Sequence, residues 1–235
     1  MRVQDCNWMQ LEEYLRGDDR IVLPLGSIEQ HGYLSLGVDM ILSERVSVEA
    51  AEPLGVPVLP SLPYGITPYF AAYPGSPTLS AETYQAVIRE LLDSLHGQGF
   101  RRFLLVNGHG GNDPGGAAAA EWSTGHPDAQ TVWHNWWKGP RTWEVVQSID
   151  ADASHASWLE NFPWTRLEGI AQPQERKPMA DVSRMLESSP ADVRAALGDG
   201  SFGGLYERPD DDVLRVWRAG VEEVRDLIES GWSNV

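Results

Sequence analysis

The sequence predicts a single three-layer α/β domain over residues 1–235, with a mostly parallel β-sheet between two layers of helices. Two short apolar runs, Ile21–Leu25 and Phe103–Val106, have the length of buried strands. Each run is followed by a loop rich in glycine and polar residues and then by a segment with helical features, an alternation typical of parallel sheets. A chain of 235 residues is also long enough to bury one sizeable core.

In the first part of the chain, apolar spacing and capping residues place four elements. Helices are marked by apolar residues three or four apart after a polar N-cap, and strands by short apolar runs. We expect, in order, a helix over residues 8–15 capped by Asn7, a strand over 20–25, a helix from Asp39 to Ala51 and a strand over 56–59 ended by Pro60.

A long segment rich in proline, glycine and tyrosine then runs from Ser61 to Thr78. Loops of this length without secondary structure of their own are usually functional lids or binding loops. The aromatic residues of the segment either line a pocket or pack against another subunit, and the sequence favours neither alternative; they are Tyr64, Tyr69, Phe70 and Tyr73.

The second half of the chain continues the alternation, and no linker divides it. Two polar loops lie over residues 172–179 and 198–209, and the latter either folds near the functional site or carries an exposed edge. The expected elements are an amphipathic helix from Ser80 to near Gly97, a strand over 103–106, a small-residue helix over 117–121, a strand over 131–134 and a last helix capped by Asp210–Asp212 that extends through Ile228.

Composition and charge exclude several kinds of partner. The formal net charge is −16 and the isoelectric point is near 4.6, which argues against a nucleic acid or an anionic membrane as partner. The N-terminus lacks the apolar region of a secretory signal, and no stretch approaches about 18 consecutive apolar residues. Cys6 is the single cysteine, so an intramolecular disulfide is excluded. We therefore expect a soluble, cytoplasmic protein.

Candidate metal ligands follow the first predicted strand, in the segment Gly26-Ser27-Ile28-Glu29-Gln30-His31-Gly32. Glu29 and His31 are two residues apart, so on an extended backbone their side chains leave on the same side. A carboxylate and an imidazole placed in this way are a common start to a transition-metal site. Asp39 enters the following helix, and its two oxygens could bridge two ions. The alternative is a solvated pair, with Asp39 as a helix N-cap.

A second motif, Val106-Asn107-Gly108-His109-Gly110-Gly111-Asn112, follows the strand over 103–106. Loops after the carboxyl ends of parallel strands gather at one edge of a sheet, so His109 is expected beside Glu29, His31 and Asp39. The glycines let the backbone turn tightly and approach a ligand. A phosphate-binding loop is the alternative. However, the motif lacks the lysine and hydroxyl residue of a P-loop and the spacing of a dinucleotide fingerprint.

Together these motifs resemble the creatininase (creatinine amidohydrolase) family. The resemblance covers roughly residues 20 to 162, with the motifs in the family's order. Two further segments extend it. Leu62-Pro63-Tyr64-Gly65, followed by Tyr73-Pro74-Gly75-Ser76-Pro77-Thr78-Leu79, is similar to the family's Pro-Tyr-Gly and Phe-Pro-Gly-Thr stretch. His155-Ala156-Ser157-Trp158-Leu159-Glu160-Asn161 looks like a variant of its His-Ala-Gly-x-x-Glu-Thr motif.

The resemblance implies a site with two divalent metal ions. Glu29, Asp39 and His109 would hold one ion, and His31, Asp39 and Glu160 the other. Nitrogen and oxygen ligands together suit Zn²⁺, Mn²⁺ or Fe²⁺. Catalytic roles fall on Glu160 and on His155, which would donate a proton to the leaving nitrogen or hold the substrate. The candidate substrate contacts are Tyr73, Gly110, Gly111, Trp136 and Trp158.

The predicted reaction is cleavage of a cyclic or linear C–N amide bond of a small molecule by metal-activated water. The alternatives are a peptidase or deformylase acting on a modified peptide or formamide, and a degenerate scaffold that binds a metal or ligand without turnover. Ser157 and Asn161-Phe162 depart from the family pattern, so we do not expect creatinine itself as the substrate. The resemblance also implies a homo-oligomer, commonly a hexamer, whose contacts the tryptophan-rich stretch 133–143 could fill.

Overall fold

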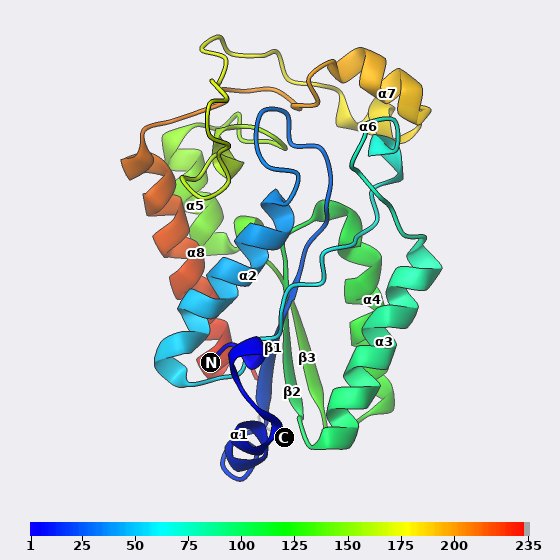
Figure 1. The fold of residues 1–235 in the computed structure, drawn as a ribbon, viewed down its shortest axis with the longest axis vertical. Coiled ribbons are helices and arrows are strands. Elements are labelled where there is room, and N and C mark those ends of the chain that lie inside the picture. The colour runs from blue at the N-terminus through cyan, green and yellow to red at the C-terminus, as the bar shows by residue number, and fades with distance from the viewer. Residues whose placement is uncertain (233–235) are drawn as a thin grey trace.

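A parallel sheet of three strands forms the centre of the computed structural model, which describes residues 1–232 (Figure 1). Leu25 is paired with Asn107, and Asn107 with Asn135, so the strands end in register at one edge. The predicted α/β architecture with parallel strands is confirmed. The strands are β1 (Arg20–Leu25), β2 (Arg102–Asn107) and β3 (Gln130–Asn135), side by side in chain order.

Helices cover both faces of the sheet (Figure 1). One face carries α2 (Val38–Ala51), α5 (Pro140–Ile149) and α8 (Asp210–Ser230), and the other carries α3 (Ala81–Gln98) and α4 (Asp113–Gly125). The short helix α1 (Trp8–Tyr14) lies near the amino ends of the strands. At the opposite end of the molecule, α6 (Val182–Leu186) and α7 (Pro190–Leu197) lie beyond the carboxyl edge of the sheet.

Short 3₁₀ helices occur in the connections between these elements. They are η1 (Val3–Asp5), η2 (Glu52–Leu54), η3 (Pro68–Phe70), η4 (Gly110–Asn112), η5 (Trp136–Lys138) and η6 (Trp158–Glu160). Three of them, η4, η5 and η6, lie in or directly beside the motifs from which the functional site was predicted.

Successive side chains of each strand point to opposite faces of the sheet, and each face has its own hydrophobic core. In β1, Ile21, Leu23 and Leu25 pack in the cluster that includes α3 and α4, whereas Val22 packs in the cluster that includes α2 and α8. The side chains of β2 alternate in the same way. Because successive side chains point to opposite faces, a strand covered on both faces is apolar throughout. This explains why both strands are continuous apolar runs in the sequence.

Capping explains where several helices begin. Asn7 caps α1 in a capping box with Gln10, and Ser80 caps α3. The cap predicted for the last helix is wrong, because Pro209 occupies its N-cap position. Asp210–Asp212 form the first turn of α8 without a side-chain cap hydrogen bond. Their charges still stabilise the helix, because they lie at the positive end of its dipole.

The strand predicted over residues 56–59 is also wrong. Among the described residues of this segment, only Val58 forms β-bridges, to Val22 and to Arg2. Val22 donates a hydrogen bond to the carbonyl of Pro57 and accepts one from the nitrogen of Leu59, but Pro57 and Pro24 of β1 have no N–H groups with which to extend the pairing. The segment therefore lies along β1 without becoming a fourth strand.

Helical structure is more extensive than the sequence predicts. The helix predicted over residues 117–121 extends over the whole of α4, and α5, α6 and α7 were not predicted. No helix within residues 1–232 has both the length and the apolar character needed to cross a bilayer.

The close approach of β2 to α2 can be tested at Gly108. A Cβ atom at this position would lie 2.4 Å from the main-chain oxygen of Asp39. We expect Gly108→Ala to lower the free energy of unfolding by about 1–3 kcal/mol, the usual cost of overpacking. Gly125→Ala is the matched control, because a Cβ there meets nothing within 4 Å. Urea denaturation with chelator present compares the variants, and equal midpoints would contradict the prediction.

Candidate metal centre

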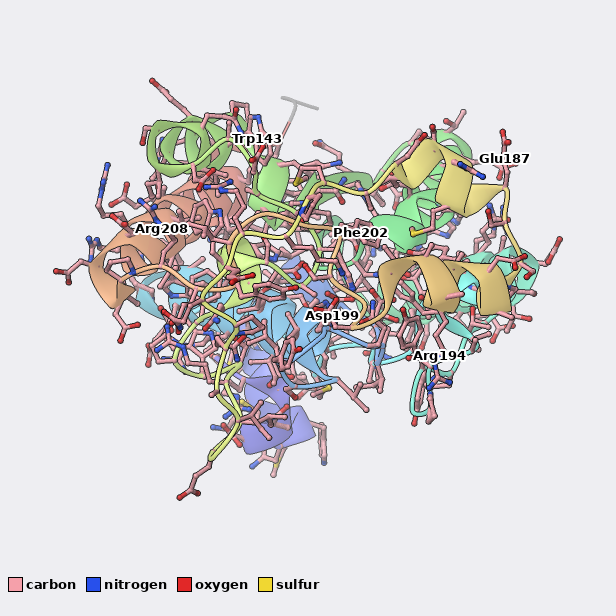
Figure 2. The ribbon with its side chains drawn as sticks, turned by 90° about the horizontal axis from the view of Figure 1, so that it is seen from above. Trp143, Glu187, Arg194, Asp199, Phe202 and Arg208 are labelled. Atoms are coloured by element: carbon pink, nitrogen blue, oxygen red, sulfur yellow. The ribbon has the colours of Figure 1, made fainter. Side chains whose placement is uncertain are left out.

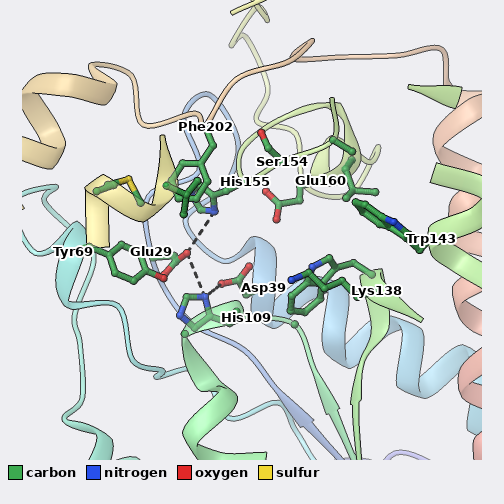
Figure 3. A pocket seen from close by; sticks show the side chains of 18 residues that line it. Glu29, Asp39, Tyr69, His109, Lys138, Trp143, Ser154, His155, Glu160 and Phe202 are labelled. Atoms are coloured by element: carbon green, nitrogen blue, oxygen red, sulfur yellow. Dashed lines mark ion pairs between the residues drawn. The ribbon is translucent and has the colours of Figure 1, made fainter. Parts of the chain in front are cut away.

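Loops at the carboxyl edge of the sheet bring the predicted metal ligands together (Figure 3). Two of these loops follow β1 and β2, as predicted, and the third joins α5 to α6. Glu29 and His31 come from the loop after β1, Asp39 from the first turn of α2, His109 from the loop after β2, and His155 and Glu160 from the α5–α6 loop.

Asp39 connects the two predicted sets of ligands. Its Oδ2 lies 3.0 Å from Nδ1 of His109, and that same nitrogen lies 3.4 Å from Oε1 of Glu29. Its other oxygen, Oδ1, lies 3.1 Å from Nε2 of His31, which lies 3.7 Å from Oε2 of Glu160. Each oxygen of one buried carboxylate therefore faces a different histidine.

Main-chain carbonyls orient two of the histidines. Nδ1 of His31 lies 3.1 Å from the main-chain oxygen of Glu29, and Nε2 of His109 lies 3.0 Å from that of Ile66. A ring nitrogen that donates its proton to a carbonyl leaves the other nitrogen with a free lone pair. In both residues that other nitrogen faces the carboxylates, which is the usual orientation of a histidine that binds a metal.

Two carboxylate oxygens of the cluster lack hydrogen-bond partners among the described residues. They are Oε2 of Glu29 and Oδ2 of Asp39, whose 3.0 Å approach to His109 does not have hydrogen-bond geometry. Both residues are almost completely buried. Buried charged oxygens without partners are costly, and a bound cation would satisfy them. The donor set, carboxylate oxygens with imidazole nitrogens, also fits a transition metal such as zinc or manganese.

Three overlapping groups of side chains have ligand atoms within 4.8 Å of one another, close enough to hold a metal ion. The first two are the predicted sets and share Asp39. The third takes Glu29 from the first set and His31 from the second, and adds His155. The groups are Glu29, Asp39 and His109; His31, Asp39 and Glu160; and Glu29, His31 and His155.

Burial and neighbouring charges shift the pKa values of the cluster. Burial alone would lower the pKa of His31, but the carboxylates of Asp39 and Glu160 raise it to about 10. His109 is affected in the same way, and Glu29 and Asp39 hold its pKa well above the ordinary value. Burial raises the pKa of Glu160 to about 7. Without metal the cluster therefore retains protons that would otherwise be released at neutral pH.

His155 lies in the wall of the site rather than at its centre. Its Nδ1 is 3.6 Å from Oε1 of Glu29, and its Nε2 is 2.9 Å from the main-chain oxygen of Gln30. The ring stacks on Phe70 and also contacts Phe202, with 4.8 Å between ring centroids in each case. Burial, with the nearby positive charge of His31, lowers the pKa of His155 well below its ordinary value.

A pocket of about 550 Å³ opens onto the cluster. Gly110 and Gly111, two of the candidate substrate contacts, line it. Gly111 lies so close to the long loop before α3 that a Cβ atom would be 1.9 Å from the main-chain oxygen of Ile66. Glycine at this position therefore allows His109 to reach that oxygen.

The predicted aromatic substrate contacts do not line the pocket. Trp136 and Trp158 are fully buried in the core beside α8, and Trp136 packs against Trp217. Tyr73 packs against Phe70 and is not among the residues that line the pocket.

Other aromatic and apolar side chains take their place. Tyr69 comes from the long loop before α3, and Trp137 and Trp143 come from the tryptophan-rich stretch. The polar loop after α7 folds over the site, where it contributes Phe202 (Figure 2). Its main chain is held there by Gln30, which donates a hydrogen bond of 3.0 Å to the oxygen of Gly200. Aromatic residues beside two strand ends were the feature of the sequence that could have indicated this wall. The sequence did not show which of them face the pocket.

The residues that depart from the family pattern have structural roles. The hydroxyl of Ser157 donates to the main-chain oxygen of Ser154 at 2.7 Å and accepts from the nitrogen of the same residue at 2.9 Å. Asn161 donates to the main-chain oxygen of Tyr206 at 2.7 Å, and Phe162 is buried in the core. None of the three is among the residues that line the pocket.

The raised pKa values predict that metal binding strengthens with pH. In the metal-free site His31, with a pKa of about 10, carries a proton at neutral pH that a metal ion must displace. We expect the affinity to rise at least about tenfold per pH unit between about pH 6 and 8. Competition with a chromophoric chelator at several pH values measures this. An affinity that is constant over this range would exclude His31 as a ligand.

Comparison with protein families and curated proteins gives a consistent result. The family model described as creatininase, creatinine amidohydrolase, matches residues 4–233. Creatinine amidohydrolase of Pseudomonas putida is 32% identical over 114 residues, which cover 46% of this chain and 44% of that protein. A 3-dehydro-scyllo-inosose hydrolase of Thermotoga maritima is 31% identical over 109 residues, 46% of this chain and 35% of that protein. The matched region thus spans less than half the length of these relatives.

Solved structures share the fold over almost the whole chain. A creatininase crystal structure superposes with a TM-score of 0.79 at 22% identity and covers 100% of this chain and 98% of that chain. A putative creatinine amidohydrolase from Bacteroides fragilis superposes with a TM-score of 0.75 at 26% identity and covers 97% and 95%. Similar creatininase structures include a Zn–Zn form and a manganese form. The chain belongs to the creatininase family.

Proposed function

We propose that the protein is a two-metal amidohydrolase that cleaves a C–N amide bond of a small molecule. The observation that supports this best is the position of Asp39, which offers one oxygen to each of two sets of nitrogen and oxygen ligands. A carboxylate shared in this way is typical of centres whose two ions lie about 3.5–4 Å apart. Family membership agrees with this reaction, because the matching model is that of creatinine amidohydrolase.

In this proposal, Glu29, Asp39 and His109 hold one ion, and His31, Asp39 and Glu160 hold the other. When bound, such ions polarise a carbonyl group and lower the pKa of water, which supplies the nucleophile at neutral pH. The chain's own contribution is to fix the ligands. Loops from two strand ends and a helix turn hold the first set, and the α5–α6 loop completes the second.

His155 would move the proton that amide cleavage requires. An attacking water must lose a proton, and the leaving nitrogen must gain one. The imidazole lines the pocket beside Glu29, and the rings of Phe70 and Phe202 limit its movement. A fixed ring in this position can accept a proton from water and pass it to the nitrogen. Glu160 would act as a ligand and, through its contact with the main-chain nitrogen of Ala156, would fix the loop that carries His155.

The pocket supports a small substrate. Its volume of about 550 Å³ lies within the ordinary range for small-molecule sites, and a peptide would extend beyond it. The relatives differ in substrate: their names refer to creatinine, to an inosose and, for a protein of Mycolicibacterium smegmatis, to a precursor peptide. The apolar walls favour an amide with an apolar or planar part.

We also propose a homo-oligomer, for which exposed Trp8 and Met9 offer apolar contact surface.

The first prediction from this proposed function concerns metal content. The purified protein should carry close to two divalent ions per chain, because Asp39 joins two complete sets of ligands. Hydrolysis of small amides should stop in chelator and return when zinc or manganese is added. Elemental analysis beside the activity assay measures both. A protein without bound metal that remains fully active in chelator would refute the proposal.

A second prediction separates Asp39 from His155. Asp39→Asn should lower metal content and rate together, because it replaces the only carboxylate that faces both sets. His155→Ala should leave both ions bound and slow turnover by about 10²–10⁴, the usual effect of losing a general acid or base.

Metal content and kcat are measured for each of these variants. His155 also belongs to a third possible group of ligands, with Glu29 and His31. If His155→Ala removes an ion while Asp39→Asn keeps both, His155 is a ligand and Glu160 has been assigned wrongly.

A further inference from the structure

One cation of the pocket has no hydrogen-bond or ion-pair partner among residues 1–232. Lys138 and Lys177 are the only lysines of the chain. Lys177 is fully engaged, since its ammonium group contacts Asp199 and donates to the main-chain oxygens of Leu197 at 2.6 Å and Ser201 at 2.8 Å. Lys138 lines the pocket, and within residues 1–232 its side chain forms no hydrogen bond or ion pair. Lys138 is exposed to solvent, so its ammonium group is available to a bound molecule.

The backbone of Lys138 is fixed on both sides. Trp136, two residues earlier, is buried and packs against Phe162 and Trp217, with ring centroids 6.1 and 5.5 Å away. After Lys138, the first turn of α5 is held by Glu223 of α8, whose Oε2 accepts from the nitrogen and the hydroxyl of Thr142 at 3.0 and 2.7 Å. The lysine side chain is therefore free while its Cα position is fixed.

Lys138 lies across the pocket from part of the metal centre. Figure 3 shows Lys138 and Trp143 on one side and Glu29 and Tyr69 on the other. Among the described residues that line the pocket, Lys138 is the only lysine or arginine. The aromatic ring of Trp143 lies on the same side, and Trp137, the residue before Lys138, also lines the pocket. A substrate whose amide reaches the acidic cluster can therefore extend along apolar rings and end at this cation.

The charge that Lys138 would recognise is a carboxylate. A phosphate group usually needs several donors or a free helix N-terminus. The N-terminus of α5 is not free, because Glu223 already accepts from its main-chain nitrogens. A single ammonium group on a flexible stem matches a group with one negative charge. A cationic substrate end would instead be repelled.

We propose that Lys138 binds a carboxylate of the substrate, so that the protein hydrolyses amides that carry a free carboxylate at the end remote from the scissile bond. This proposal rests on the amidohydrolase function proposed above. Lys138 is then a specificity-determining residue that contacts the substrate away from the reacting atoms.

Kinetics with matched amides tests the preference. The anionic probes are N-benzoylglycine, N-benzoyl-β-alanine and N-benzoyl-4-aminobutanoate, which place the carboxylate at increasing distance. The neutral probes are N-alkylbenzamides of matched length. We expect at least one anionic probe to be preferred in kcat/KM, and Lys138→Met to reduce that preference about tenfold through KM. Lys138→Arg, which keeps the charge, should retain most of it. Amide hydrolysis with no carboxylate preference in any pair would overturn the proposal and leave the amidohydrolase function standing.

Binding provides a second readout that does not depend on turnover. Reductive methylation with ¹³C labels both lysines and the amino terminus, and Lys138→Arg assigns the Lys138 resonance. The anionic probes should shift that resonance and leave the Lys177 resonance unchanged, which serves as an internal control. Equal shifts with the neutral probes would overturn the proposal. So would a resonance that responds to protein concentration and not to carboxylates, because Lys138 would then lie in a contact between copies. If no amide is hydrolysed, the function fails and these shifts still decide the role of Lys138.

Discussion

The site depends on the contacts that the buried carboxylate of Asp39 makes with two histidines. It stands at the start of α2, faces His109 at the end of β2 with one oxygen, and faces His31 in the loop after β1 with the other. The geometry requires the main chains of β2 and α2 to approach closely, which Gly108 permits. Because the strands end in register, both histidines arrive at the level of this carboxylate.

A cluster of this kind would destabilise the fold if its buried charges had no partners. Glu29, Asp39 and His31 are almost inaccessible to solvent, and burial of unpaired charges is costly. The structure offsets part of this cost with imidazole–carboxylate contacts and with main-chain carbonyls that accept the remaining ring protons. Oε2 of Glu29 and Oδ2 of Asp39 still have no hydrogen-bond partner among the described residues. A metal ion bound to these oxygens would therefore also stabilise the fold.

The loop that carries His155 and Glu160 differs from the family pattern without disturbing the centre. Ala156 has a positive φ of 55°, and its nitrogen donates to Oε2 of Glu160 at 2.6 Å. Ser157, where the family has glycine, has an extended backbone with φ −107° that any residue can adopt. The glycine is thus not required here for its conformation. Differences in substrate would then arise from the pocket walls, where Tyr69, Trp143 and Lys138 lie.

The sequence by itself determined the architecture and the polar residues of the centre. Short apolar runs identify strands that are covered on both faces, and residues at parallel strand ends must meet at one edge. Glu29, His31, Asp39 and His109 are therefore close together in the structure. The same local signals misplaced the segment 56–59, because strand pairing needs N–H groups that Pro57 cannot provide.

Only the tertiary structure decided which side chains line the pocket. Trp136 and Trp137 are neighbours in the chain, but Trp136 is buried against α8 and Trp137 lines the pocket. Composition cannot separate them, because the burial of each ring depends on helices that lie far away in sequence. The same holds for Lys138. Its sequence context shows a lysine after two tryptophans, but not which residues surround its side chain in space. The direction in which a side chain points, and the residues that it contacts, depend on how segments pack together. That packing is set by contacts between residues far apart in the sequence, which no single stretch contains.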